Sequence, residues 1–199
     1  TTAPSASGGA AMLEYIAAHR TGYILRQLLW LAPSLFLMVV FLALTVALRR
    51  HSPSLAALAG LIAVSSWAVS LAWPTTGEGS LTMVLLSDRY AAAATAGERA
   101  SFVAGAEVLD ALNDAPAVIG VLQTLGLLLM SLLMLYGTLS KRLAWLGVAA
   151  GGVGLVSEIL KPVLGPGYAA YGLLLFVWLA WVAVALWRLA ASGPMHRIP

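Results

Sequence analysis

Five long runs of apolar residues dominate the chain. Charged side chains are rare in these runs, each of which approaches the 20 or so residues that a helix needs to cross a bilayer. The runs do not show the alternation of apolar and polar residues that is typical of a membrane strand. The pattern therefore predicts an all-α, polytopic transmembrane helix bundle with about five spans, at 28–48, 55–73, 117–139, 143–161 and 168–189.

The polar segment between the second and third runs predicts an outer helical hairpin at 80–114. Ser80 is placed to cap a first helix, and Thr95 and Glu98 have capping-box spacing for a second. Four apolar residues of the second helix recur every three or four positions and are expected to share one face: Phe102, Ala106, Leu109 and Leu112. We expect both helices to rest on the outer ends of the bundle; a pair lying only on lipid is the alternative.

Composition supports a membrane protein. Of the 199 residues, 61% are hydrophobic and 10% are charged, whereas a soluble domain is about one quarter charged. We therefore predict a single integral membrane domain over 1–199. It has a polar N-terminal tail at 1–11 and an extracytoplasmic loop at 74–116, and we see no signal peptide.

The charges of the loops predict the orientation. The segment 74–116 contains six of the eight acidic residues. In two of the other loops, 49–54 and 140–142, and in the end of the last span and the tail, every charged residue is basic: Arg49, Arg50, Lys141, Arg142, Arg188 and Arg197. This places the N-terminus outside and the C-terminus in the cytoplasm. Arg20 and Arg26 argue against it and leave open an extra half-span within 12–27.

The residue types needed for catalysis or cofactor binding are not found together within the spans. There is no cysteine, which excludes thiolate catalysis and thiolate metal sites. The histidines, at positions 19, 51 and 196, lie outside the predicted spans, which disfavours haem or pigment ligation there. No common catalytic motif is present. The net charge is +3, but the basic residues are scattered at the ends of the predicted helices. This distribution does not indicate nucleic-acid binding. We therefore expect no enzyme activity, no cofactor and no metal site.

Glycines predict close helix packing in the third and fourth spans. Spacings of three and four residues place Gly147, Gly151 and Gly154 on one face of the fourth span. Gly126 and Gly137 lie in a comparable stripe on the third.

The glycine face of the fourth span continues into two charged residues, Glu158 and Lys161. With Ser70 and Gln123, they are candidates for an outer-leaflet polar pocket, because an ionisable group at membrane depth is a functional-site hypothesis by default. The simpler interpretation is that Glu158 and Lys161 pair with each other near interfacial water.

Part of the chain resembles a known family. The stretch "LSDRYAAAATAGERASFVAGAEVLDALND", a Leu/Met-rich span, "SKRLAWLGVAAGGVGLVSEIL" and a last apolar span are similar to an uncharacterised bacterial integral-membrane family catalogued only as a domain of unknown function. The resemblance covers roughly residues 80–189. It implies a multi-pass helix bundle in the bacterial cytoplasmic membrane, commonly with one more span, and it transfers no catalytic residue.

Two hypotheses for the function follow. The first is a non-catalytic accessory or scaffold subunit of a larger membrane complex, such as a respiratory or photosynthetic one, that holds its partner subunits by helix packing. The alternative is a stand-alone protein that binds or transports a small lipophilic or amphiphilic molecule in the outer polar pocket. In both cases the surroundings are the lipid bilayer.

Overall fold

The structure is a computed structural model that describes residues 8–72, 75–76, 79–114, 118–137, 139–164, 167 and 169–191. The chain divides into two compact units. Unit 1 consists of Thr1–Ser34 and Ser70–Ala115, and unit 2 consists of Leu35–Val69 and Pro116–Pro199. The single integral membrane domain expected from the sequence stays a prediction.

Among the described residues, four helices are long and apolar enough to cross a membrane, which confirms a multi-pass helical protein. They are α2 (Arg20–Leu48), α3 (Pro53–Ala72), α7 (Lys141–Ile159) and α9 (Ala169–Ala191). The predicted span at 117–139 coincides with α6 (Val118–Met134), which is apolar but has 17 residues. At about 1.5 Å per residue, α6 is close to the minimum for a spanning helix.

The first span begins earlier than the expected residue 28. Helix α2 starts at Arg20 and continues through Pro33 without a break. Its residues up to Ser34 belong to unit 1. Residues 12–27 form parts of two helices, because α1 (Gly9–Ala18) precedes α2; an extra half-span there stays a prediction. The polar tail is therefore shorter than predicted, since residues 9–11 are helical; residues 1–7 lie outside the described residues.

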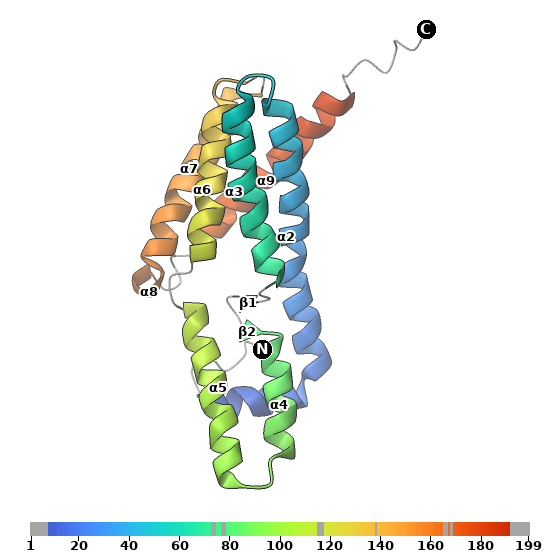
Figure 1. The fold of residues 1–199 in the computed structure, drawn as a ribbon, viewed down its shortest axis with the longest axis vertical. Coiled ribbons are helices and arrows are strands. Elements are labelled where there is room, and N and C mark those ends of the chain that lie inside the picture. Colours follow the sequence, from blue (N-terminus) through green and yellow to red (C-terminus); the bar gives the residue numbers. More distant parts are fainter. Residues whose placement is uncertain are drawn as a thin grey trace. The chain divides into compact units, whose positions relative to one another are not determined.

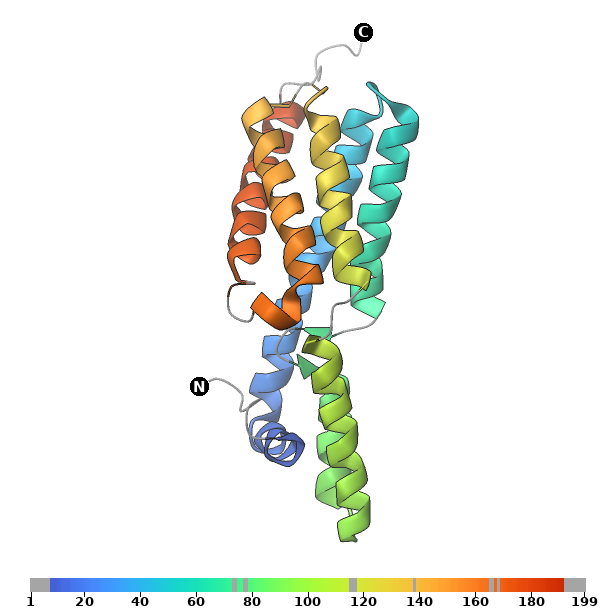
Figure 2. The same cartoon turned by 90° about the vertical axis from the view of Figure 1, so that its left-hand side faces the viewer.

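Unit 2 is a helix bundle in which α6 lies beside α7 and α7 packs on α9 (Figures 1 and 2). Its core combines residues from α2, α3, α6, α7 and α9, and the largest fully buried side chain is Trp178. The Trp178 ring stacks on Phe41 of α2, with ring centroids 5.8 Å apart. Large apolar side chains also cover the exposed surface of the spans, as expected for helices surrounded by lipid.

Unit 1 is built around α1, which packs on α4 (Thr82–Ala92) and α5 (Ala96–Asp114). Its core contains side chains from α1, α2 and α4: Met12, Ile16, Tyr23, Met83 and Val84. The Ser87 hydroxyl on α4 donates a hydrogen bond of 2.7 Å to the Leu13 carbonyl on α1. Two short antiparallel strands, β1 (Thr75–Thr76) and β2 (Gly79–Ser80), precede α4.

The segment predicted as a helical hairpin forms the helices α4 and α5, with hydrogen bonds at the predicted capping residues; its outer position stays a prediction. The Ser80 hydroxyl accepts a hydrogen bond of 3.2 Å from the Thr82 N–H in the first turn of α4. At α5 the Glu98 N–H donates to the Thr95 hydroxyl at 3.2 Å. In return, the Glu98 carboxylate accepts hydrogen bonds from the N–H groups of Thr95 and Ala94, at 3.1 and 3.0 Å. This is the reciprocal arrangement of a capping box.

The four apolar residues expected to share one face of α5 are not equally buried. Ala106 is buried and Phe102 and Leu109 are half-buried, whereas Leu112 is 53% exposed. Each three-residue step turns a helix by about 300°, so the steps from Ala106 to Leu109 and to Leu112 carry the row about 120° round the axis. Leu112 thereby leaves the side of α5 that Ala106 buries.

The capping box predicts how the start of α5 responds to pH. Hydrogen bonds from the backbone N–H groups of Thr95 and Ala94 hold the pKa of the Glu98 carboxyl below its ordinary value. A lowered folded-state pKa stabilises the fold above the unfolded-state pKa, and this contribution is lost as the pH falls through the folded-state value. We expect hydrogen-exchange protection factors of the first turn of α5 to fall in acid, and Glu98→Gln to remove that dependence.

Thr95→Ala, which removes the hydroxyl acceptor, is expected to lower stability by about 1 kcal/mol. Ser101→Ala is the matched control, because the Ser101 hydroxyl only bonds back to the Gly97 carbonyl of the same helix. If Thr95→Ala and Ser101→Ala lower the hydrogen-exchange protection of the first turn of α5 equally, a role for the capping box is contradicted.

Candidate functional site

The carboxylate of Glu158 is buried at the end of α7. Its side chain is only 5% exposed, and it lies directly against Gly120 of α6, where a Cβ atom would meet the carboxylate. Glu158 also interacts electrostatically with Tyr171, a buried residue of α9. The structure therefore places this carboxylate among three helices of unit 2 and away from lipid.

Lys161 does not continue the helix that carries Glu158, contrary to the predicted span at 143–161. Helix α7 ends at Ile159, and Lys161 begins the short helix α8 (Lys161–Leu164). The physical reason is Pro162, which has no N–H to donate to the carbonyl four residues earlier, that of Glu158. The N–H groups of Val163 and Leu164 instead bond to the Leu160 carbonyl, at 2.8 and 3.0 Å.

The other two pocket candidates lie on different parts of the chain. Gln123 is half-buried on α6, one turn after Gly120 and so on the same side of that helix. Ser70 is half-buried near the end of α3 and belongs to unit 1, whereas Gln123, Glu158 and Lys161 belong to unit 2. A ligand pocket formed by these four residues stays a prediction.

The glycine positions on α7 lie where neighbouring helices approach closely. A Cβ atom on Gly151 would lie 2.8 Å from both Cα and N of Leu128 on α6. One on Gly154 would lie 2.7 Å from Thr124 Cγ2. At Gly147 it would meet the Ser131 hydroxyl of α6 and the Trp178 indole nitrogen of α9. These glycines of α7 therefore face helices of the same chain.

The two glycines predicted for the third span also lie at close contacts. A Cβ atom on Gly126 would lie 2.7 Å from the Cα atom of Ala63 on α3, and one on Gly137 would lie 2.8 Å from Leu48 Cδ2. Gly60 of α3, which sequence reasoning did not single out, has the same role against Thr45 of α2. Its only signal is that it is a glycine inside an apolar run.

A buried polar pair was also missed by sequence reasoning. The Ser131 hydroxyl and the Trp178 indole N–H are both fully buried, and neither has a hydrogen-bond partner among the described residues. Both lie against Gly147. Sequence reasoning did recognise Gly147 as a packing residue. It could not identify the residues that face Gly147, because they come from two other helices.

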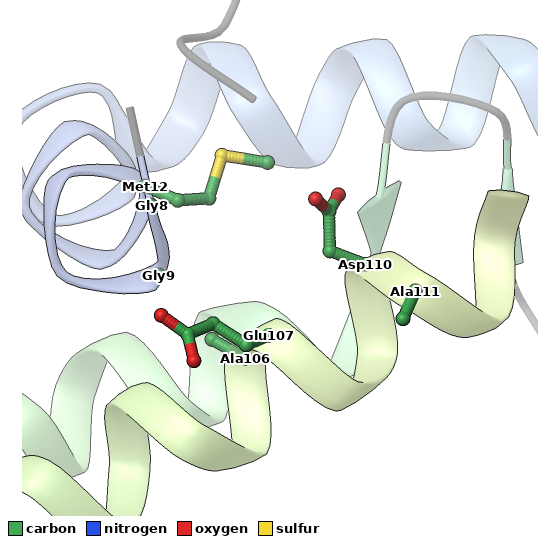
Figure 3. Close-up of a pocket in the computed structure, with 7 residues that line it drawn as sticks. All are labelled: Gly8, Gly9, Met12, Ala106, Glu107, Asp110 and Ala111. Carbon is green, nitrogen blue, oxygen red and sulfur yellow. The ribbon is translucent and has the colours of Figure 1, made fainter. Parts of the chain in front are cut away.

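Unit 1 contains a cavity of about 270 Å³ beside the N-terminal end of α1. Figure 3 shows the carboxylates of Glu107 and Asp110, both on α5, turned towards this cavity. Negative charge near a helix N-terminus is favourable because the unbonded N–H groups there carry partial positive charge. Among the described residues, no three His, Asp or Glu side chains are grouped as metal ligands.

Unit 2 has two open grooves, one of about 490 Å³ between α3 and α6 and one of about 910 Å³ between α2 and α9. Apolar side chains make up most of both walls, and His51 lines both grooves. None of the three cavities described here is lined by Gln123 or Glu158.

A comparison with known protein families identifies the family of the chain. The family DUF4386, a domain of unknown function, matches residues 4–193 of the chain. The chain belongs to the DUF4386 family. This confirms the resemblance seen over residues 80–189 and extends it to nearly the whole sequence. Searches of curated proteins and of solved structures gave no match to this DUF4386 chain.

The glycines of α7 provide a matched pair of variants in this DUF4386 protein. Gly151→Ala would bring a methyl group onto the backbone of Leu128, whereas a Cβ atom on Gly152 has nothing within 4 Å. Because backbone atoms cannot turn aside, we expect Gly151→Ala to lower stability by about 1–3 kcal/mol. Gly152→Ala is expected to be neutral or stabilising by up to about 1 kcal/mol. Thermal unfolding in detergent measures both, and equal effects would contradict close packing at Gly151.

Proposed function

We propose that this protein is a non-catalytic accessory or scaffold subunit of a larger membrane complex, and that α5 presents the surface that a partner binds. The observation that carries the proposal is an exposed face of α5 without charged residues. Five exposed residues make up this face, and each lies within about 40° of Val108 around the helix axis: Gly97, Ser101, Ala104, Val108 and Leu112.

The composition of this face suits a helix partner. Small residues allow two helix backbones to approach closely, and the one polar side chain, Ser101, satisfies its hydroxyl within α5. Val108 and Leu112 are 59% and 53% exposed, so a partner that covers them buries two large apolar side chains. Helix α5 lies in unit 1, which contains only the first part of the candidate span α2, up to Ser34.

Charge favours a protein partner over a lipid surface. The loop at 74–116 contains six carboxylates, and four of them lie on α5 itself: Glu98, Glu107, Asp110 and Asp114. Anionic headgroups repel such a segment, whereas basic segments are attracted to them. We therefore assign the exposed face to another subunit of the complex.

We also propose five crossings, with α6 as the third, the N-terminus outside and the C-terminus in the cytoplasm of a bacterial cell. The support is that α6 lies beside α7 in the same bundle and that basic residues mark alternate loops. A reporter fused after Pro199 is expected to be active only on the cytoplasmic side. Activity only on the outer side would overturn this orientation.

The partner surface is tested by Val108→Glu, which places a charge in the middle of the exposed face. We expect the full-length protein, purified in mild detergent, to form a stoichiometric complex of defined mass, and Val108→Glu to reduce its recovery at least about tenfold. Ala91→Glu is the matched control, because Ala91 is exposed on α4 and lies off this face.

Equal recovery with both variants would contradict the assignment of the face. A wild-type protein that purifies alone and monodisperse would overturn the accessory function. It would then favour the alternative, a binding protein that uses Ser70, Gln123, Glu158 and Lys161; that alternative predicts ligand-dependent thermal shifts, which Glu158→Gln abolishes.

A further inference from the structure

The groove between α2 and α9 is a wedge. The two helices meet where Phe41 stacks on Trp178, and Figure 1 shows α9 inclined to α2. The groove of about 910 Å³ is lined by residues from the C-terminal halves of both helices. Its volume lies in the range of sites for small organic ligands, about 300–1,000 Å³.

The walls of the wedge and its end differ in chemistry. Apolar side chains line the walls, from Val39 to Ala47 on α2 and from Ala183 to Ala190 on α9. The stretch from Val39 to Ala47 corresponds to about 12 Å of helix. Arg50 and His51, which follow α2, line the groove at its end. The wedge is therefore amphipathic along its length.

The end of unit 2 that carries Arg50 is strongly basic. Figure 2 shows the end of α2, the start of α7 and the end of α9 at the same end of the bundle. These segments carry four further basic residues: Arg49, Lys141, Arg142 and Arg188. The sequence of unit 2 contains a single acidic side chain, Glu158, at the opposite end of α7 from Lys141. An anionic group at Arg50 and His51 therefore meets a positive field with little opposing charge.

We propose that this wedge binds one anionic phospholipid, with an acyl chain between α2 and α9 and the phosphate at Arg50 and His51. A partner helix fits less well, because a helix is about 10 Å across and the wedge closes at the Phe41–Trp178 stack. A flexible acyl chain is thin enough to enter such a narrowing space. Basic pockets between membrane helices are a known mode of binding for anionic headgroups.

The headgroup decides the selectivity. An acyl chain gains little by leaving other acyl chains for an apolar groove, because both surroundings are equally apolar. The phosphate, by contrast, gains charge-assisted hydrogen bonds from the Arg50 guanidinium, which matches phosphate geometry. The site is therefore expected to discriminate among lipids by charge and not by chain.

The test uses the full-length protein in mild detergent with two lipids of identical chains, palmitoyl-oleoyl phosphatidylglycerol and phosphatidylcholine. Native mass spectrometry is expected to show one phosphatidylglycerol retained, at least about fivefold more than phosphatidylcholine. Phosphatidylglycerol alone is expected to raise the unfolding temperature, and glycerol phosphate, which has the headgroup without the chains, to leave it unchanged.

Two pairs of variants separate the headgroup from the chain. Arg50→Gln is expected to cut retention of phosphatidylglycerol about fivefold, while Arg142→Gln, with the same loss of charge outside the groove, leaves it unchanged. Ala183→Phe fills the wedge without changing charge and is expected to abolish retention. Ala180→Phe is its control, since Ala180 is exposed on α9 and does not line the groove.

Several results would overturn the proposal: equal retention of the two lipids, equal losses in Arg50→Gln and Arg142→Gln, or full retention in Ala183→Phe. A thermal shift with glycerol phosphate alone would reassign the site to a soluble anion. Trp187 lines the groove. Cross-linking from this position to another protein, without retained lipid, would assign the wedge to a partner. The site lies in unit 2, so Val108→Glu in unit 1 tests the accessory function separately.

Discussion

The close approach of α6 and α7 is the contact on which the rest of unit 2 depends. Helices in a bilayer gain little from hiding apolar surface from one another, because lipid tails are as apolar as leucine. Their association depends on van der Waals contact at short range, and Gly151 provides it by letting the backbone of Leu128 come within reach. Gly147 and Gly154 extend the contact towards α9, and Gly120 makes room on α6 for the Glu158 carboxylate.

Sequence patterns predicted the features that depend on local chemistry. Long apolar runs identified the helices, and the pairing of Thr95 with Glu98 located the start of α5, because the capping box involves only neighbouring residues. Features that depend on distant residues were not predicted. The partners of Glu158 come from α6 and α9, and the identity of one helix's neighbours cannot be read from its own periodicity.

Two differences from the sequence predictions have local causes that are visible in retrospect. Pro162 separates α7 from α8 and so places Glu158 and Lys161 on different helices. Pro33 lies within α2 and does not end it. The effect of proline therefore depends on context. Near the end of an apolar helix, proline ends the series of backbone hydrogen bonds. Within a long membrane helix, neighbouring groups can bond to the carbonyl that proline leaves unbonded.

Unit 1 is assembled from segments far apart in the chain, and this sets an order of events during synthesis. The Leu13 carbonyl and the Ser87 hydroxyl that bonds to it are 74 residues apart. Helix α1 is made before α4, and the surface that covers Met12 and Ile16 is not made until two long apolar helices have followed α1. Non-local contacts of this kind form slowly because a long loop must close first. A nascent chain stalled within α3 therefore presents α1 uncovered, as a target for chaperones or proteases.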